Sequence, residues 1–489
     1  MSSKMEMTIK IINEDGEKIE KTISREIPHL KEFEEEGFRT AFGDIETAVL
    51  ESRKTISEEA IETYMEEMSK KKIGEGEIEA KNYGIESEMG KINTKSHKKV
   101  ENGKTENTEG TLYPKLKPLE NYRSIRYDEL QLKFMSELSA RKTAEFLNRI
   151  RLEYNGSKAT TVRNQAEKAG EKIEEYVSNL TGVTLYENGF SLDGKPTEEE
   201  KYKSDNREYM DMSTIATAAA ESEITSPIYL KDYENPEQSI NLSIDDVCSK
   251  AQKPNRPMSE KAKSAKKINN TVIHIENESG KYIVNSSKIK EALRIALCFL
   301  LYNGVLSGKQ LVFFTDGARI LHDAIRDMFD FMGVNYKIIL DWYHLHKKLK
   351  EELSRALNNT NIRNETVDII KPFLWLGDVD AAISALRNIS SQYIKAPEKI
   401  DEFIGYLNRV RDYIPCYELR KNLGLRNSSN LGEKANDLVV SSRQKHNGMS
   451  WSKDGSSALA SVCAANANSE IDTWVRDASL RFKFVQKSA

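Results

Sequence analysis

The sequence has few cysteines and no long apolar run, and each absence excludes a class of protein. Only four cysteines occur in 489 residues, and none of them lies close to another. This spacing rules out a zinc knuckle or a disulfide framework and is typical of a reducing compartment. The longest apolar run, residues 295–305, contains Tyr302 and Asn303 and is too short to span a bilayer. The first residues are polar and lack a signal-peptide core, so we expect a cytoplasmic protein without a membrane segment.

The sequence also lacks an excess of positive charge. Lys and Arg number 73 against 77 Asp and Glu, which gives a formal net charge of −4. Any DNA-binding surface must therefore be local. With 38% hydrophobic and 31% charged residues, the chain can fill real cores, which excludes a fully disordered protein. At roughly 150 residues per domain, the length predicts about two to four domains.

The composition changes along the chain. Residues 1–67 contain strand-like and helical pieces and form an N-terminal accessory region. Residues 68–118 are rich in Lys, Glu, Gly, Asn and Ser and have almost no large apolar residues. Such a stretch cannot bury enough apolar surface to offset the entropy of ordering. We expect a charged flexible linker there, acting as an inert spacer in preference to a binding arm.

Residues 119–180 have a helical pattern. One apolar stripe includes Ala144 and Leu147, a break follows at Gly156, and a second helix begins near Thr160. Two helices with a short Gly-containing connection are typical of a helix-turn-helix. In that interpretation the second helix presents Arg163, Asn164 and Gln165 to base edges and phosphates. An ordinary helical hairpin with a solvated polar face is the alternative.

The rest of the chain, residues 181–489, alternates strand-like and helical segments. Continuous apolar runs such as LVFF and KIIL indicate strands that are buried on both faces, as in an α/β sheet. The short β-rich runs GVTLYENGFSL and SPIYLKDY are also predicted to form strands.

Three aspartates occur where a predicted strand ends or is interrupted: Asp245 in SIDDV, Asp316 in TDGA and Asp341 in LDWYH. A carboxylate at such a place is costly unless it binds something, and a hard cation such as Mg²⁺ or Mn²⁺ prefers oxygen ligands. Taken alone, however, Asp316 is better explained as a cap of the helix that follows.

The order of the motifs resembles bacterial insertion-sequence transposases of the DDE type, in the Mutator-like group with an RNase H-like catalytic core. The matching segments are SIDDV, LVFFTDGA, ILDWYHLHKKL and the long C-terminal stretch from SSNLGEKANDLVV to GMSWSKDGSSAL. In the last of these, Gly448, Met449, Trp451 and Ser452 supply the Gly-Met-x-Trp-Ser signature. The resemblance covers about residues 130–468 and leaves out the N-terminal 120 residues or so.

The resemblance implies a triad of metal-binding catalytic carboxylates, Asp245, Asp316 and Glu433, with Asp341 and His344 as a supporting [Cys/Asp]-x-x-His pair. It also implies two Mg²⁺ or Mn²⁺ ions and a helical insertion at about residues 347–426. Two metal ions can activate the attacking oxygen of a phosphodiester displacement and stabilise the departing one, so no nucleophilic Ser or Tyr is needed.

Several of these assignments have alternatives. Glu433 also suits an ordinary solvated helix start, where the helix dipole favours a carboxylate. His344 could be a core histidine, and Asp316, Asp341 and Glu433 form a rival triad. Trp375, within the predicted insertion, is better explained as a core residue than as a base-stacking one.

Basic residues gather near the predicted carboxylates and would contact DNA phosphates there. The first group comprises Lys250, Lys253 and Arg256, with Lys261, Lys263, Lys266 and Lys267 continuing it. The second consists of Arg443 and Lys445. A solvated charge run is the alternative for the first group.

These features predict a transposase that binds the ends of an insertion sequence and catalyses metal-dependent DNA strand cleavage and strand transfer. Its partners would be double-stranded DNA, as element ends and target, and further copies of itself on that DNA. We expect it in the bacterial cytoplasm, associated with the nucleoid when bound. The alternatives are a related metal-dependent DNA nuclease and a domesticated DNA-binding protein without catalysis.

Overall fold

The computed structural model divides the chain into two compact units, which are described separately below. One contains residues 1–169 and 470–480, and the other contains residues 170–469 and 481–489. The structure describes residues 3–12, 16, 18–27, 38–73, 77–101, 104–105, 123–153, 156–191, 193–197, 209–252, 267–306, 309–330, 332–445 and 449–486. The fold is mixed α/β, as the alternation of strand-like and helical segments predicted.

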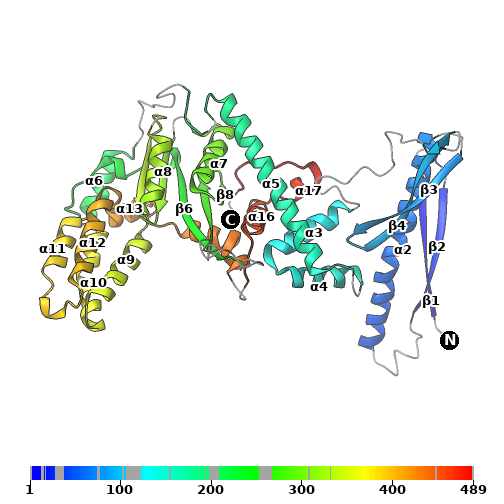
Figure 1. Cartoon of the computed structure of the whole chain (residues 1–489), viewed down its shortest axis with the longest axis horizontal. Coiled ribbons are helices and arrows are strands. Elements are labelled where there is room, and N and C mark those ends of the chain that lie inside the picture. Colours follow the sequence, from blue (N-terminus) through cyan, green and yellow to red (C-terminus); the bar gives the residue numbers. More distant parts are fainter. Residues whose placement is uncertain are drawn as a thin grey trace, which may run out of the picture. The chain divides into compact units, whose positions relative to one another are not determined.

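The first unit begins with two β-hairpins and a long helix (Figure 1). Strands β1 (Ser3–Ile12) and β2 (Lys18–Ile27) pair antiparallel, and helix α2 spans Phe38–Ile73. Strands β3 (Glu77–Ser87) and β4 (Gly90–Glu101) form the second hairpin, with the short β5 (Lys104–Thr105) on its edge.

The expectation of a flexible linker over residues 68–118 is wrong for the part that the structure describes. The strands β3 and β4 pair along their whole length through a two-residue turn, so their backbone hydrogen bonds do not depend on large apolar side chains. Ile92, opposite Ile85 in the ladder, is 2% exposed and supplies local apolar burial. Residues 106–118 of the predicted linker lie outside the described residues.

Three helices complete the first unit: α3 (Ile125–Glu137), α4 (Ala140–Arg151) and the first part of α5 (Ala159–Glu187), with α17 (Ile471–Asp477) against α3. Arg123 forms a buried ion pair with Asp128 at 2.6 Å. Arg151, also buried, pairs with Glu86 of β3 and hydrogen-bonds the hydroxyl of Tyr127 at 3.2 Å. These contacts connect the second hairpin to the helices.

Helix α5 runs to Glu187, so the strand predicted at GVTLYE is helical instead. Val177, Leu180 and Leu185 pack into the main apolar core of the second unit. Helical spacing brings these three residues to one side of α5, which a strand would not do. The division between the two units falls within this helix, after Ala169, and not at residue 180.

The second unit is built on a five-stranded mixed sheet with the order β10-β9-β6-β7-β8 (Figure 1). Its strands are β6 (Ser239–Lys250), β7 (Lys267–Glu276), β8 (Lys281–Ser286), β9 (Gln310–Thr315) and β10 (Tyr336–Leu340). Strands β6, β7 and β8 are antiparallel neighbours, whereas β9 is parallel to both β6 and β10. The central strand is therefore β6.

Helices cover both faces of this sheet. On one face, α7 (Ile289–Tyr302) and α8 (Arg319–Phe329) pack on Ile240, Leu242 and Ile244 of β6. On the other, α14 (Asn430–Asn436), a π-helical turn (Asp437–Ser441) and α16 (Lys453–Ala467) pack around Val247 and Val272. The remaining short helices are α6 (Met212–Glu221), α13 (Tyr417–Asn422) and α15 (Ser442–Gln444).

The segment expected as a helical insertion is helical. Between β10 and α14 the chain forms α9 (Trp342–Ala356), α10 (Thr360–Trp375), α11 (Val379–Arg387), α12 (Pro397–Val410) and α13. These helices share an apolar core with Val312 and Phe314 of β9. Trp375 packs against Trp342, with ring centroids 4.6 Å apart, and its indole N–H donates to Glu418. This environment is that of a packing residue.

No helix among the described residues combines the length and the apolar character needed to cross a membrane.

A buried ionic cluster joins the start of β10 to the insertion. Glu234 is 2% exposed. Its carboxylate accepts hydrogen bonds from the two terminal guanidinium nitrogens of Arg420, at 2.7 and 2.8 Å, and forms an ion pair with Lys337 at 2.7 Å. Burial alone raises the pKa of Glu234, but the two cations outweigh burial and lower the pKa to about 2. Burial and the neighbouring Arg420 lower the pKa of Lys337 to about 8. The carboxylate is therefore what permits two cations to be buried there.

We predict that Glu234→Gln lowers the free energy of unfolding by about 3–5 kcal/mol, because it leaves Arg420 and Lys337 without their counter-charge. The midpoint of urea denaturation at pH 7 measures this loss. Because the pKa of Glu234 is depressed, its stabilisation is present above the ordinary value of 4.5 and is lost as the pH falls towards about 2. The difference from the unaltered chain should therefore shrink in acid.

Glu237→Gln is the matched control, since Glu237 is exposed in the same segment and its midpoint should not move. Equal midpoints for Glu234→Gln and Glu237→Gln would contradict the structural role of Glu234.

Candidate active site

The side chain of Asp245 lies on the face of β6 that is covered by α14. Successive strand residues alternate between faces, so Leu242 and Ile244 enter the core beneath α7 and α8 while Ser243 and Asp245 face α14. Asp245 is half-buried, and the amide nitrogen of Asn436 donates to its Oδ2 at 2.6 Å. Asp246 is exposed and bonds Thr271 at 2.5 Å. The strand does not end there, contrary to expectation, but continues to Lys250.

Asp316 follows directly after β9, the parallel neighbour of β6. The register places Ser243 of β6 beside Phe314 of β9. Each of these two strands therefore brings a carboxylate to the same end of the sheet. One oxygen of Asp316 accepts the backbone N–H of Ala318 at 2.9 Å, which is the local capping role considered above. The residue is exposed, and this single bond leaves its second oxygen available for a ligand.

Gly317 allows the sharp turn after Asp316. Its φ of +84° is strained for other residues, and a Cβ there would lie 2.7 Å from the hydroxyl of Tyr406 and 2.9 Å from Leu340. The glycine thus permits α12 of the insertion to approach the carboxylate.

Asp245 and Asp316 interact electrostatically. Burial raises the pKa of Asp245 to about 6, the charge of Asp316 adds to this rise, and His344 opposes it. Asp245, whose ionisation is disfavoured by burial, and the exposed Asp316 together offer carboxylate oxygens that suit a divalent cation.

Asp341 caps helix α9 and orients His344. Its Oδ1 accepts the backbone N–H of His344 at 2.8 Å and lies 3.2 Å from the imidazole Nδ1, while Oδ2 accepts the N–H of Ser429. Burial raises the pKa of Asp341, but hydrogen bonds from His344 and Ser429 outweigh this and hold it below its ordinary value. Asp341 is 1% exposed and both of its oxygens are occupied, so its position is that of a supporting residue.

His344 connects Asp341 to the other aspartates. The hydrogen bond to Asp341 raises the pKa of His344, and the charges of Asp245 and Asp316 raise it further against the effect of burial. The imidazole therefore hydrogen-bonds one carboxylate and experiences the charges of two others.

Glu433 lies on α14, which approaches β6 closely. A Cβ on Gly432 would be 2.8 Å from the Cβ of Ser243, so glycine is needed for this contact. Glu433 itself is half-buried. In the described part of the chain, no group of three or more His, Cys, Asp or Glu side chains is placed to hold a metal ion. The predicted cluster of Asp245, Asp316 and Glu433 around two metal ions is therefore not assembled in this structure.

The C-terminal signature residues have structural roles. Trp451 donates its backbone N–H to Lys250 at 2.9 Å and its indole N–H to Gln444 at 3.2 Å. Ser452 caps α16 by accepting the N–H of Gly455 at 3.0 Å. Met449 is half-buried, and Gly448 lies outside the described residues. This segment therefore hydrogen-bonds the C-terminal end of β6, at Lys250.

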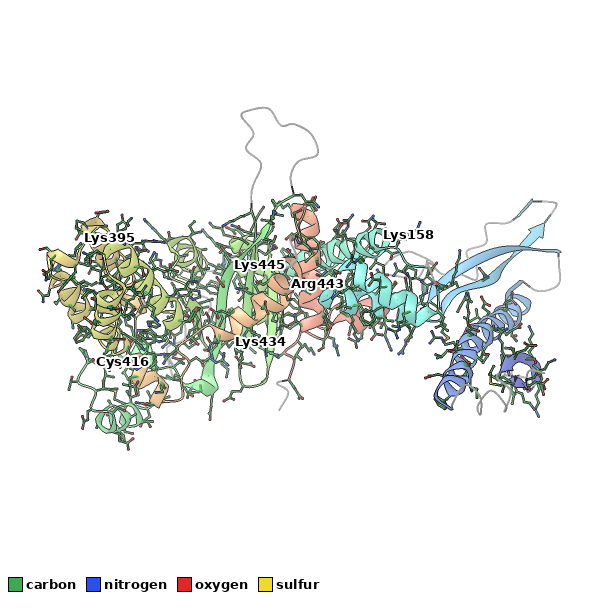
Figure 2. The ribbon with its side chains drawn as sticks, turned by 90° about the horizontal axis from the view of Figure 1, so that it is seen from below. Lys158, Lys395, Cys416, Lys434, Arg443 and Lys445 are labelled. Atoms are coloured by element: carbon green, nitrogen blue, oxygen red, sulfur yellow. The ribbon has the colours of Figure 1, made fainter. Side chains whose placement is uncertain are left out.

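Among the predicted phosphate-binding residues, Arg443 requires correction. Its side chain is 2% exposed, so it cannot reach DNA without local rearrangement, and burial also lowers its pKa. Figure 2 labels both Arg443 and Lys445. Lys445, two residues later, is exposed, as are Lys250 and Lys267. The others of the first group, namely Lys253, Arg256, Lys261, Lys263 and Lys266, lie outside the described residues.

The predicted helix-turn-helix differs from expectation in its connection. Seven residues, 152–158, separate α4 from α5, whereas the turn of such a motif has about 3–4. Arg163 and Asn164 are exposed near the start of α5, and Gln165 is half-buried. Arg163 forms only a weak ion pair with Glu167 at 3.7 Å. The surface remains accessible to a ligand although the connection is longer.

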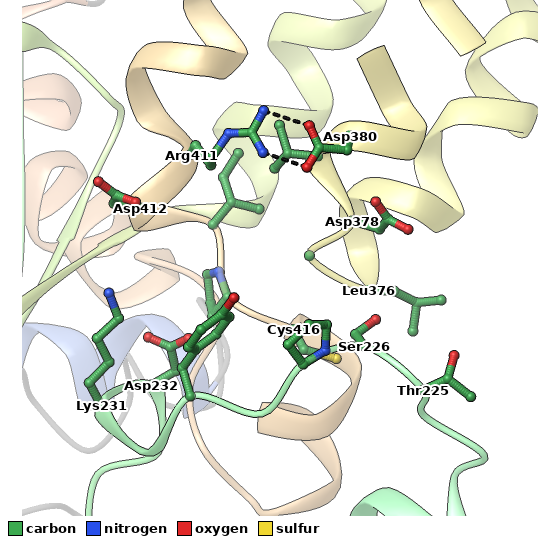
Figure 3. A pocket seen from close by; sticks show the side chains of 16 residues that line it. Thr225, Ser226, Lys231, Asp232, Leu376, Asp378, Asp380, Arg411, Asp412 and Cys416 are labelled. Atoms are coloured by element: carbon green, nitrogen blue, oxygen red, sulfur yellow. Dashed lines mark hydrogen bonds and ion pairs between the residues drawn. The ribbon is translucent and has the colours of Figure 1, made fainter. Parts of the chain in front are cut away.

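A separate cavity of about 500 Å³ contains none of these carboxylates (Figure 3). It is lined by residues 225–232 and by parts of the insertion, including the ion pair of Arg411 with Asp380 at 2.7 and 2.8 Å. Its lining includes acidic and basic side chains of the insertion and of the segment before β6.

Comparisons of the chain with protein-family models, curated proteins and solved structures give no match.

Sequence reasoning did not find Asn436. The signal was its spacing, because residues three apart on a helix share a face and Asn436 follows Glu433 by three.

We predict that Asp341→Asn lowers the pKa of His344 towards its ordinary value of 6.5, because a neutral amide no longer stabilises the imidazolium. Titration of the imidazole protons by NMR measures this change. Since the raised pKa stabilises the fold at low pH, and this contribution is lost as the pH rises through it, the variant should lose most stability on the acid side. Asp323→Asn, on α8, should leave the pKa of His344 unchanged, and an equal shift in both variants would refute the pairing.

Proposed function

We propose that this protein is a DDE transposase that binds the ends of an insertion sequence and catalyses metal-dependent DNA cleavage and strand transfer. The observation that carries the proposal is the parallel pairing of β9 with β6, which brings Asp245 and Asp316 to the same end of the sheet. The mixed sheet, with helices on both faces and a helical insertion before α14, supports an RNase H-like core.

Asp245 and Asp316 would hold a divalent cation, and Glu433 on the adjacent helix would have to approach them to serve as the third carboxylate. The donor set suits Mg²⁺ or Mn²⁺, since it offers hard carboxylate oxygens on rigid elements. When bound, such ions activate the attacking oxygen and stabilise the leaving oxygen of a phosphodiester. His344, which hydrogen-bonds Asp341, would hold a proton beside the reacting group.

DNA phosphates near the end of β6 and beyond α14 would be contacted by the exposed Lys250, Lys267 and Lys445. In the other unit, DNA would be contacted by Arg163, Asn164 and Gln165 near the start of α5. Oligomerisation on DNA belongs to the same proposal. A metal-dependent nuclease would use the same carboxylates and differ only in whether the new 3′-hydroxyl attacks a second DNA.

Asp245→Ala, Asp316→Asn and Glu433→Gln are each predicted to lower Mg²⁺-dependent cleavage of DNA from the flanks of the gene by at least about 100-fold. Gel-shift affinity should persist, because these changes remove cation ligands and not phosphate contacts. The matched control is Asp246→Ala, which should retain a measurable fraction of cleavage because Asp246 points away from α14.

Near-normal cleavage by one of the three variants would remove that residue from the site. Cleavage without joining to a second duplex would favour the nuclease, and specific binding without cleavage by the unaltered chain would favour the non-catalytic alternative.

The double variant Arg163→Ala/Gln165→Ala is predicted to weaken binding to the element ends about tenfold or more, and binding to random duplex much less. Groove contacts are worth about 1–3 kcal/mol each and depend on sequence, whereas phosphate contacts do not. Fluorescence anisotropy at fixed salt measures both affinities. An equal loss on both DNAs would identify a nonspecific phosphate surface.

A further inference from the structure

Asn436 is a buried polar residue in direct contact with the first aspartate. Its side chain is 6% exposed, and its amide nitrogen donates to Asp245 at 2.6 Å. Its amide oxygen is also buried and has no hydrogen-bond partner among the described residues. A buried amide oxygen without a partner costs about 1–3 kcal/mol, and in a native protein this cost calls for an explanation such as a bound ion.

The surroundings of Asn436 are those of an apolar helix face. The preceding Ala435 and the following Val439 and Val440 are buried against Val247 and Val272 of the sheet. The close contact of Gly432 with Ser243 holds α14 on β6, so the side chain of Asn436 is buried beside Asp245. An aliphatic residue would fill the same space without the free-energy cost of burying an unpaired polar group. Packing alone therefore does not explain an amide at this position.

A π-helical turn, Asp437–Ser441, follows Asn436 directly. Such turns interrupt α-helices mostly at functional sites. Here the turn separates the segment that carries Glu433 and Asn436 from the buried Arg443 and Gln444.

We propose that Asn436 is a further member of the carboxylate site, which positions Asp245 and gives its side-chain oxygen to the divalent cation. An amide oxygen is a hard neutral ligand that suits Mg²⁺ and Mn²⁺. Rotation of the amide exchanges its nitrogen and oxygen, so that one side chain can donate to a free carboxylate or accept beside a cation-bound one. This inference rests on the proposed cation site, but it concerns cation binding and not DNA chemistry.

The test measures Mn²⁺ affinity of the full chain without DNA, by isothermal titration calorimetry and by the electron paramagnetic resonance signal of free Mn²⁺. Asn436→Leu keeps the size of the side chain and removes both polar atoms, and we expect it to weaken Mn²⁺ binding about 10–100-fold. Asn436→Asp keeps an oxygen and should bind Mn²⁺ at least as well as the unaltered chain. Asn430→Leu is the matched control, because Asn430 is exposed on the same helix.

Unchanged Mn²⁺ affinity in Asn436→Leu, while Asp245→Ala abolishes binding, overturns the inference and leaves the proposed function intact. Loss of affinity in Asn436→Asp also overturns it, as does the absence of Mn²⁺ binding by the unaltered chain. If Asn436→Leu fails to fold, as judged by circular dichroism, Asn436→Asp alone decides. Asn436-dependent Mn²⁺ binding without any DNA cleavage supports the inference and counts against the transposase.

Discussion

The parallel pairing of β9 with β6 is the constraint on which the site depends. Because both strands run in the same direction, Asp245 and Asp316 emerge at the same end of the sheet, where their charges interact. An antiparallel β9 would deliver Asp316 to the opposite end. Parallel neighbours need a crossover, and α7 provides the helical part of the connection between the antiparallel strands and β9.

The helical insertion contributes to the site through contacts at its two ends. At its start, Asp341 caps α9 and fixes His344. Beyond its end, the N–H of Ser429 returns to Asp341, which anchors the chain just before α14. Tyr406 in the middle lies against Gly317, next to Asp316. The helical insertion therefore contacts the residues around the carboxylates and helps to hold them in position.

Buried polar groups in the second unit fall into two kinds. Glu234, Arg420 and Lys337 neutralise one another, and their cluster lies at the start of β10. Asp245 and Asn436 lie at the other end of the strands beside the exposed Asp316, and the amide oxygen of Asn436 has no hydrogen-bond partner among the described residues. A cluster whose charges and hydrogen bonds are balanced within the protein stabilises the fold. A cluster with an unpaired polar atom is instead a candidate for ligand binding.

The sequence by itself determined the α/β class, the buried strands LVFF and KIIL and the helical run after DWYH. These follow from local apolar runs and helical periodicity. Only the tertiary structure decided that residues 77–101 pair as a hairpin, that GVTLYE is helical and that Arg443 is buried. Strand pairing and burial depend on residues far away in the chain, and these residues cannot be predicted from a short segment of sequence. Asn436 illustrates the same limit, because its role arises from contact with Asp245, which lies almost 200 residues earlier and meets it only when α14 packs on β6.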